Sequence, residues 1–368
     1  MKLQRLGYVA GIALTATLAV SACGSDNNTP TTTANNGSSA ATGNCGSGTV
    51  NAQGSSAQKN AMSEWIKNYQ GQCSGLTINY EANGSGAGIE AFLAGTAYFA
   101  GSDSALKEDE QPQADAKCAG GAAVHLPMVI GPIAVVYNVS GVDSLQLKPA
   151  TIAKIFSGKI TKWDDPAIAA DNSGVKLPST TIQTVHRSDE SGTTDNFTKF
   201  LSKTAEADWT LGNAKQWKAP GGTGAKGSDG VASRVKSTDA TISYVELSFA
   251  ENSDLKMAKV ANGAGEFVEL TPESAGKTIE SAKVAGTGND LKLEIDYNTK
   301  TAGAYPLVLV TYEIACSKGT AADKLPAIKG FLTYTSSSEG QQALTELGYA
   351  PLPETMRTKV AASAAAIS

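Results

Sequence analysis

The segment HRSDESGTTDNF, residues 186–197, holds side chains that could bind an oxyanion. Arg187 can donate two parallel hydrogen bonds to such a group, and Asp189 could hold its guanidinium in place. The hydroxyl- and glycine-rich triplet at 191–193 precedes an expected helix over 195–201. The first turn of a helix leaves N–H groups free and carries a partial positive charge. These residue types therefore predict an anion-binding helix start.

Three further turns have the same character, because each is rich in glycine and serine and is expected between a strand and a helix. They are Gly54-Ser55-Ser56-Ala57, Gly84-Ser85-Gly86 and Gly101-Ser102-Asp103. Ser, Thr and Gly cap helices in most proteins, so any one turn could be ordinary capping. Four such turns that meet in one cleft with Arg187 would form an anion site, since glycine lets a ligand approach the backbone.

Asp103 indicates which anion such a site would favour. A carboxylate can only accept hydrogen bonds, so an anion beside it must bring a proton to donate. Phosphate near neutral pH still carries a proton, whereas sulfate carries none. Asp103 therefore predicts that phosphate is selected over sulfate, by hydrogen bonding and by repulsion of the fully ionised anion.

Five segments together have a familiar pattern: GSGAGIEAFLAGTAYFAGSDSAL, IFSGKITKWDDPAIA, HRSDESGTT, GAKGSDGVASRV and ISYVELSFA. They resemble the phosphate-binding lipoproteins of bacterial high-affinity phosphate ABC transporters. The resemblance runs from about Gly48 to the C-terminus. It implies a protein that is not an enzyme and needs no cofactor. Such a protein binds inorganic phosphate and delivers it to ABC permease membrane subunits with a cytoplasmic ATPase.

The resemblance also implies a binding site, in which dehydrated phosphate lies between two lobes. Asp103 would accept its proton, and Arg187, supported by Asp189, would supply the only full positive charge. N–H groups and hydroxyls would come from Ser55, Ser56, Ala57, Ser85, Ser191, Gly192 and Thr193. Two positions depart from the usual family pattern: Ala57 is small, which should leave binding intact, and Glu190 replaces a glycine. We expect the Glu190 side chain to point to solvent.

Other functions match parts of the sequence. Residues 56–59 fit the S-x-x-K pattern of penicillin-recognising enzymes, but the chain has no K-T-G and its S-D-N falls at 25–27. Residues 271–278 nearly match a P-loop, yet Thr271 replaces the first glycine and Pro272 favours a capped helix start. Binding of another tetrahedral oxyanion and a secreted phosphatase remain as alternatives. The chain has only two histidines, which disfavours a metal site.

Strand, glycine-rich turn and helix alternate along the chain, which indicates an α/β fold. Two apolar segments, Val124–Val139 and Tyr305–Ala315, suit extended crossings between lobes. We expect a two-lobe periplasmic-binding-protein-like fold (type II), with two hinge-crossing segments and the ligand in the interlobe cleft. Lobe I would comprise residues 48–128 plus 308–368, and lobe II residues 129–307. The elements expected beside the turns are the strands Gly48–Ala52, Leu76–Tyr80, Tyr98–Ala100 and Thr181–Val185, and the helix Ser55–Gln70.

The N-terminus is typical of an exported lipoprotein. Lys2 and Arg5 precede an apolar run over 6–20, and small residues lead to Cys23. This resembles a signal peptide over 1–22 with a lipobox, which implies cleavage before Cys23 and a lipid on its sulfur. An uncut anchor or an ordinary signal peptide is the alternative. Residues 23–47, with the lipidated cysteine, then form a disordered tether. We expect a monomer on the outer face of the cell membrane.

Charge limits the kinds of partner, and cysteine content agrees with this location. The chain has 30 Lys and Arg against 35 Asp and Glu, a net charge of −5, which disfavours nucleic acid as a partner. Four cysteines besides Cys23 favour disulfides in an oxidising compartment. Positions along the chain predict Cys45–Cys73 at one sheet edge and Cys118–Cys316 where the crossing segments begin and end. The two other pairings remain open.

Overall fold

The computed structural model describes residues 45–368. The expected signal peptide at 1–22, Cys23 and most of the expected tether lie outside the described residues. Cys45 was expected within the tether, but a disulfide joins it to Cys73, so residues 45–47 belong to the folded part of the chain. Within the described range, the helices fall short of the length and apolar character that a membrane crossing requires.

A nine-stranded mixed sheet forms the centre of the described chain, in the order β2-β1-β3-β14-β4-β8-β6-β7, and β9 also pairs with β4. Its strands are β1 (Gly48–Gly54), β2 (Leu76–Glu81), β3 (Phe99–Ser102), β4 (Ala123–Asn138), β6 (Gln183–Arg187), β7 (Thr223–Ala225), β8 (Thr241–Glu246), β9 (Lys256–Met257) and β14 (Val308–Cys316). A smaller sheet contains β5 (Gln146–Leu147), β10 (Lys259–Ala261) and β11 (Phe267–Val268), and a hairpin contains β12 (Lys283–Val284) and β13 (Leu293–Glu294).

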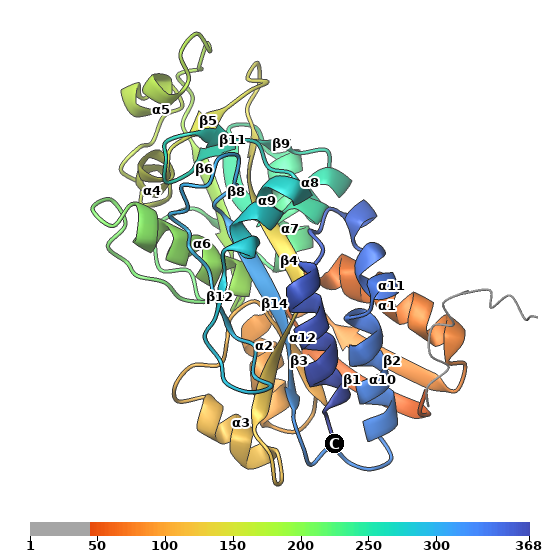
Figure 1. The fold of residues 1–368 in the computed structure, drawn as a ribbon. Coiled ribbons are helices and arrows are strands. Elements are labelled where there is room, and N and C mark those ends of the chain that lie inside the picture. The colour runs from red at the N-terminus through yellow and green to blue at the C-terminus, as the bar shows by residue number, and fades with distance from the viewer. Residues whose placement is uncertain (1–44) are drawn as a thin grey trace, which may run out of the picture. The chain divides into compact units, whose positions relative to one another are not determined.

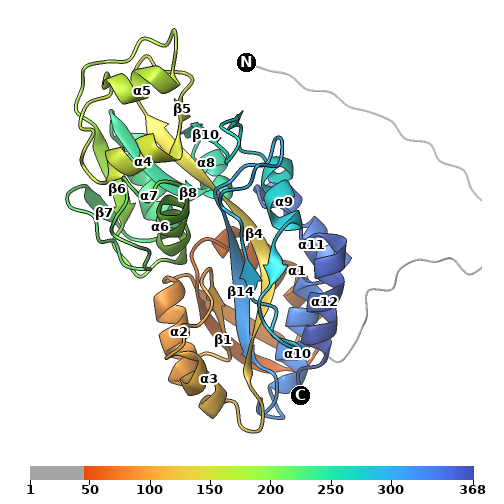
Figure 2. The ribbon, with the colours of Figure 1, turned by 60° about the vertical axis from the view of Figure 1, so that its left-hand side comes forward.

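The main sheet has two parallel parts joined by antiparallel strands. β1, β2 and β3 are parallel in the first part, and β6, β7 and β8 in the second. Between them β4 and β14 run side by side (Figures 1 and 2). Ser102 at the end of β3 pairs with Tyr312, and Glu246 at the end of β8 pairs with Ile133. The carboxyl ends of the parallel strands in both parts therefore lie near the middle of the sheet. Open α/β sheets bind ligands at the carboxyl ends of their strands.

The two crossing strands are buried along nearly their whole length. Every residue of β14 and all of β4 except Asn138 are buried, as in strands covered on both faces. Their register shifts opposite Pro127, which lacks an N–H, and Met128 is left without a partner between Pro127 and Val129. The expected lobe boundaries fall inside β4 and just before β14. They remain a prediction.

The helices cover the sheet, and α2, α6, α7 and α8 each begin within a few residues of the end of one of its strands. They are α1 (Lys59–Gln72), α2 (Ser85–Leu93), α3 (Gln111–Lys117), α4 (Pro149–Phe156), α5 (Pro166–Asp171), α6 (Gly192–Thr204), α7 (Gly227–Ser237), α8 (Leu247–Asn252), α9 (Pro272–Glu280), α10 (Leu325–Thr335), α11 (Ser338–Gln342), the 3-10 helix η1 (Thr345–Leu347) and α12 (Glu354–Ala365). The prediction that α1 begins at Ser55 was wrong. The Ser55 hydroxyl bonds to Asp103, and residues 55–58 form a turn before the helix.

Two disulfides join the cysteine pairs expected from the sequence. Cys45, just before β1, is bonded to Cys73 at the end of α1, with the two Cα atoms 5.5 Å apart. Cys118, at the end of α3, is bonded to Cys316 at the end of β14, with a Cα separation of 5.2 Å. Such bonds typically stabilise a fold by about 2–4 kcal/mol each.

Candidate anion-binding site

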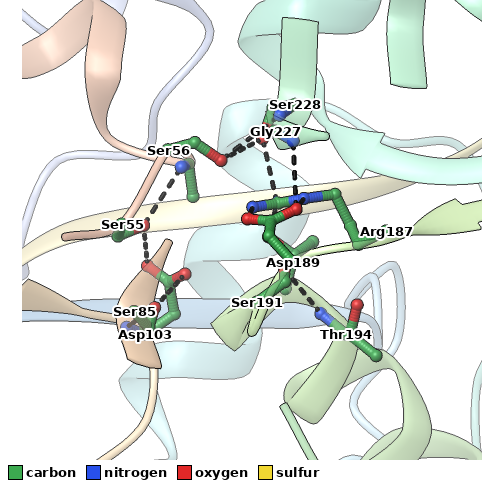
Figure 3. A network of polar contacts seen from close by, with 12 residues as sticks. Ser55, Ser56, Ser85, Asp103, Arg187, Asp189, Ser191, Thr194, Gly227 and Ser228 are labelled. Atoms are coloured by element: carbon green, nitrogen blue, oxygen red, sulfur yellow. Dashed lines mark hydrogen bonds and ion pairs between the residues drawn. The ribbon is translucent and has the colours of Figure 1, made fainter. Parts of the chain in front are cut away.

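The starts of α2 and α6 meet Asp103 at the middle of the sheet. A Cβ added to Gly192 would lie 2.5 Å from the Asp103 Cβ and 2.5 Å from the Ser85 Oγ. Only glycine allows this approach, because any side chain would overlap the carboxylate. The structure thus brings together residues that are 89 to 107 positions apart in the chain. Figure 3 shows Asp103 with Ser85 on one side and Arg187 opposite.

Three hydroxyl groups surround the Asp103 carboxylate, which is 4% exposed. Ser55 Oγ donates to Oδ1 at 2.6 Å, and Ser85 Oγ donates to Oδ2 at 3.1 Å (Figure 3). Thr311 Oγ1 donates to Oδ1 at 2.7 Å. The Asp103 backbone is held as well, since Asn196 Nδ2 donates to its carbonyl at 2.7 Å. Asp103 is therefore fixed by groups from both parts of the sheet and from the crossing strand.

Burial raises the pKa of Asp103 to about 6, and the nearby charge of Glu246 adds to this effect. The hydroxyls of Ser55, Thr311 and Ser85 act in the opposite direction, because they stabilise the charged form. The carboxylate is therefore mostly ionised at neutral pH, which is the state in which it can only accept hydrogen bonds.

Arg187 is 2% exposed, and Asp189 binds one edge of its guanidinium. Nε donates to Oδ1 at 2.8 Å and Nη2 donates to Oδ2 at 2.5 Å. Burial alone would lower the pKa of Arg187, but the hydrogen bonds and charge of Asp189 outweigh burial and raise it. Nη1 points elsewhere, to Thr193 Oγ1 and Ser228 Oγ at 3.4 Å each. This edge makes only long contacts and can face an anion.

The start of α6 supplies the expected hydroxyl cluster. Ser191 caps the helix, since its Oγ accepts a hydrogen bond from Thr194 N at 3.2 Å (Figure 3). Thr193 Oγ1 donates a short hydrogen bond to Glu246 Oε1. Glu246 is fully buried at the end of β8, so it fixes the orientation of the Thr193 side chain.

The first turn, residues 55–58, is held by its carbonyl groups. Tyr80 donates to the Ser55 carbonyl at 2.8 Å, and Tyr349 donates to the Ala57 carbonyl at 2.7 Å. A trans peptide directs its N–H opposite to its C=O. The Ser56 N–H therefore points away from Tyr80. The Ala57 N–H donates to Ser55 Oγ at 3.0 Å.

Three polar residues of this region were missed by sequence reasoning: Ser228, Glu246 and Thr311. Ser228 lies at the start of α7, where Gly227 has a φ of +69° and donates its N–H to Asp189 Oδ1 at 3.0 Å. Ser228 Oγ is 3.0 Å from Ser56 Oγ (Figure 3). A fifth glycine- and serine-rich turn therefore belongs to the cluster, with the same sequence signal as the four expected ones. The expectation that each of those four turns leads into a helix was wrong for Gly101-Ser102-Asp103, because the next helix, α3, begins only at Gln111.

Glu190 has a more specific place than the expected one. It is exposed, but its carbonyl accepts a hydrogen bond from Gly86 N at 3.1 Å. A Cβ on Gly86 would overlap the Glu190 carboxylate. The residue therefore covers the start of α2 from the opposite part of the sheet, as well as meeting solvent.

The local geometry is unfavourable to the rival motifs. Lys59 of the S-x-x-K pattern pairs with Asp229 at 2.6 Å, while Ser56 faces Ser228. Thr271 of the near P-loop caps α9, because its hydroxyl accepts a hydrogen bond from Ser274 N at 3.1 Å. Residues 45–368 contain no group of three or more His, Cys, Asp or Glu that could hold a metal ion.

Comparisons with known proteins agree on one fold. The model of the PBP superfamily domain matches residues 39–339. The chain is 44% identical over its whole length to the whole of the Mycobacterium leprae (strain TN) protein named Phosphate-binding protein PstS 3. It is 42% identical, again over both full lengths, to Phosphate-binding protein PstS 2 of Mycobacterium tuberculosis (strain ATCC 25618 / H37Rv).

Among solved structures, a high-affinity periplasmic phosphate-binding protein (PfluDING) bound with phosphate matches with a TM-score of 0.70 at 23% identity. The match covers 86% of this chain and 93% of that one. A Clostridium perfringens protein, described as a putative phosphate ABC transporter substrate-binding protein, matches with a TM-score of 0.60 at 20% identity, over 83% and 100% of the chains. The predicted periplasmic-binding-protein-like α/β fold is confirmed.

Proposed function

The chain belongs to the PstS family of phosphate-binding proteins, and on this basis we propose that it binds inorganic phosphate and delivers it to an ABC permease. The observation that carries the proposal is the environment of Asp103, a buried acceptor held by three hydroxyls opposite a buried arginine. The activity is binding without turnover.

Phosphate would be held by two kinds of contact. Asp103 accepts the proton that phosphate keeps near neutral pH, and Arg187 Nη1 donates to an ionised oxygen. The start of α6 would add N–H groups of Gly192 and Thr193, and the starts of α2, α6 and α7 would each add a partial positive charge near the remaining oxygens. Hydroxyls of Ser55, Ser85 and Thr193 can rotate to donate to the anion, since a hydroxyl hydrogen turns about its C–O bond.

Selection against sulfate follows from the same carboxylate. Sulfate cannot donate a hydrogen bond near pH 7, so it meets Asp103 only as a like charge in a buried place. Arsenate keeps a proton, and it is accepted on the same terms as phosphate. Another tetrahedral oxyanion would thus be bound only if it carries a proton.

The decisive experiment is calorimetric titration of a soluble form without residues 1–23. Phosphate and arsenate should bind, and sulfate should bind at least about a hundredfold more weakly, roughly 2.7 kcal/mol. Equal affinity for sulfate would contradict the proposed role of Asp103. Incubation with a phosphate ester tests the alternative of a phosphatase. Release of phosphate that depends on this protein would overturn a binding function.

The location of the protein is part of the proposal. Cleavage before Cys23 and lipid on its sulfur would anchor the chain, as a monomer, to the outer face of the membrane. The two disulfides suit a protein outside the cytoplasm. Labelling with a palmitate analogue should modify the parent protein and not Cys23→Ala. Label retained in Cys23→Ala would place the lipid elsewhere.

Closure of two lobes on the ligand completes the proposal. Lobe I would comprise 48–128 plus 308–368, and lobe II 129–307. Direct contacts between the two, such as Lys59 Nζ to Asp229 Oδ2 at 2.6 Å and Asn60 Nδ2 to Ser248 Oγ at 2.6 Å, would form on closing. Small-angle scattering should show a smaller radius of gyration with phosphate. An unchanged radius under saturating phosphate would contradict hinge closure.

A further inference from the structure

Glu313, in β14, is a fully buried carboxyl group that the proposed binding mechanism does not use. Neither of its oxygens has a hydrogen-bond partner among the described residues. Gln58 is also fully buried, and its Oε1 likewise has no hydrogen-bond partner among the described residues. Buried polar groups without partners are rare, so three such atoms in one region need a physical explanation.

The three atoms belong to one group of side chains, which we call the Glu313 cluster: Glu313, Gln58 and Tyr80. Gln58 Nε2 donates to Tyr80 Oη at 3.0 Å, and Tyr80 donates to the Ser55 carbonyl at 2.8 Å. Glu313 pairs with Gly101 across β14 and β3. A Cβ on Gly101 would overlap Gln58 Nε2 and Tyr80 Oη, so the glycine makes room for the cluster.

The cluster lies directly behind the anion turns. Gln58 ends the first turn, Gly101 precedes Asp103 by two residues, and Glu313 follows Thr311 by two residues on the same strand. The charge of Asp103 acts on both Glu313 and Tyr80. Any charge that Glu313 carries is therefore felt at the anion site through a buried, weakly screened medium.

A neutral Glu313 accounts for the unpartnered atoms. An ionised carboxylate without partners in a buried place is strongly unfavourable, whereas a protonated one has an O–H that can donate to the free Oε1 of Gln58. Burial raises the pKa of Glu313 to about 8, the charge of Asp103 adds to this, and the amide of Gln58 acts in the opposite direction. Glu313 therefore keeps its proton at neutral pH.

Few other groups near the cluster change charge in the same range. Burial raises the pKa of Tyr80 and of Tyr349 above the ordinary value for tyrosine, so both stay neutral well into the alkaline range. The partner of Glu313 on β4 is the apolar Leu126. Asp103, with a pKa of about 6, is already ionised where Glu313 loses its proton.

We propose that Glu313 modulates the charge of the phosphate site, because it is neutral when phosphate is captured and adds a negative charge behind Asp103 in alkaline solution, where it repels the anion. This inference rests on the proposed function. Glu313, in β14, would change the affinity for phosphate through its charge, without touching the ligand.

The test compares phosphate affinity in the parent protein and in Glu313→Gln, which has nearly the same shape and stays neutral. The quantity compared is the dissociation constant of the parent protein divided by that of Glu313→Gln. Titration of phosphate itself and of Asp103 affects both proteins alike and therefore cancels in this ratio. It should be near 1 at about pH 6.5 and rise at least about fivefold by about pH 9, with the parent binding more weakly. The exposed Glu346→Gln is a matched control, whose ratio should stay near 1 throughout. A ratio for Glu313→Gln that is flat over this range would overturn the proposal.

A second measurement needs neither phosphate nor a folded variant. In the parent protein labelled with 13C at glutamate carboxyl carbons, NMR should show one carboxyl that titrates near pH 8. If every glutamate carboxyl titrated below about pH 6, Glu313 would be ionised at neutral pH and the proposal would fail. If the parent did not bind phosphate at all, the proposed function would fail while this titration still decided the state of Glu313.

Discussion

Thr311 Oγ1 donates a hydrogen bond of 2.7 Å to Asp103 Oδ1, although the two residues are 208 positions apart. Both side chains are buried. The bond joins the strand that crosses between the two parts of the sheet to the residue that we propose accepts the phosphate proton. Thr311 is thus a positioning residue, which acts on the anion through Asp103.

Thr311→Val should weaken phosphate binding by roughly fivefold, about 1 kcal/mol. The change keeps the shape of the side chain but removes a donor that orients the carboxylate and favours its charged form. For the same reason, phosphate affinity should reach its maximum at a higher pH in Thr311→Val than in the parent protein. Thr311→Ser, which keeps the hydroxyl, should bind like the parent protein. Calorimetric titration at several pH values checks this, and equal loss in the Ser and Val variants would point to packing instead.

Asp103→Asn should lower the ratio of phosphate to sulfate affinity by at least about tenfold, roughly 1.4 kcal/mol. The amide removes the repulsion of sulfate and adds a donor, while its oxygen can still accept the phosphate proton. Arsenate should follow phosphate. Paired titrations of parent and variant with the three anions at one ionic strength measure the ratio. If the ratio did not change, Asp103 would have only a structural role.

Arg187→Ala should damage phosphate binding more than Ser191→Ala or Thr193→Ala does. A hydrogen bond to a charged group contributes about 1.5–3 kcal/mol, and a neutral one about half to 1.5 kcal/mol. The variant also leaves Asp189 without its partner, so Asp189→Asn combined with Arg187→Ala is the control for that unpaired charge. Phosphate affinity measured by titration gives the order. If Arg187→Ala bound phosphate as tightly as the parent protein, the anion site would have to lie elsewhere in the chain.

The free energy of unfolding should fall as pH rises from about 4.5 to about 8, relative to Glu313→Gln. The folded state raises the pKa of Glu313 from 4.5 to about 8. The stability that the protonated Glu313 gives to the folded state is therefore fully present below pH 4.5 and is lost as the pH rises through 8. By linkage the loss is at most about 5 kcal/mol. Urea unfolding of parent and variant at matched pH measures the difference. A difference that is the same at both ends of this window would contradict the raised pKa.

Residues next to a strand end could be predicted from the sequence because their signal is local. Arg187, Asp189, Ser85 and Asp103 each stand in or beside a short glycine- or serine-rich segment, and the structure places them together. Gly227 and Ser228 carry the same signal and could have been found by it.

Thr311 and Glu313 could not be predicted in this way. They stand within a strand that reads as a buried apolar run, and a buried threonine usually bonds to its own backbone. Their place behind Asp103 arises from the pairing of β14 with β3, which joins segments about 210 residues apart. The start of α1 was misplaced for a related reason: Ser55 has the side chain of a good helix cap, but a distant carboxylate binds its hydroxyl.

The pairing of β4 with β14 restricts how the two parts of the sheet can move. Nine residue pairs align the two strands, and the Cys118–Cys316 disulfide ties the far end of β14 to the segment that enters β4. Lengthwise translation of one strand along the other would break all of these connections at once. In the proposed hinge closure this register would favour rotation about the middle of the strands over sliding, and Arg187 would then approach Asp103 along an arc.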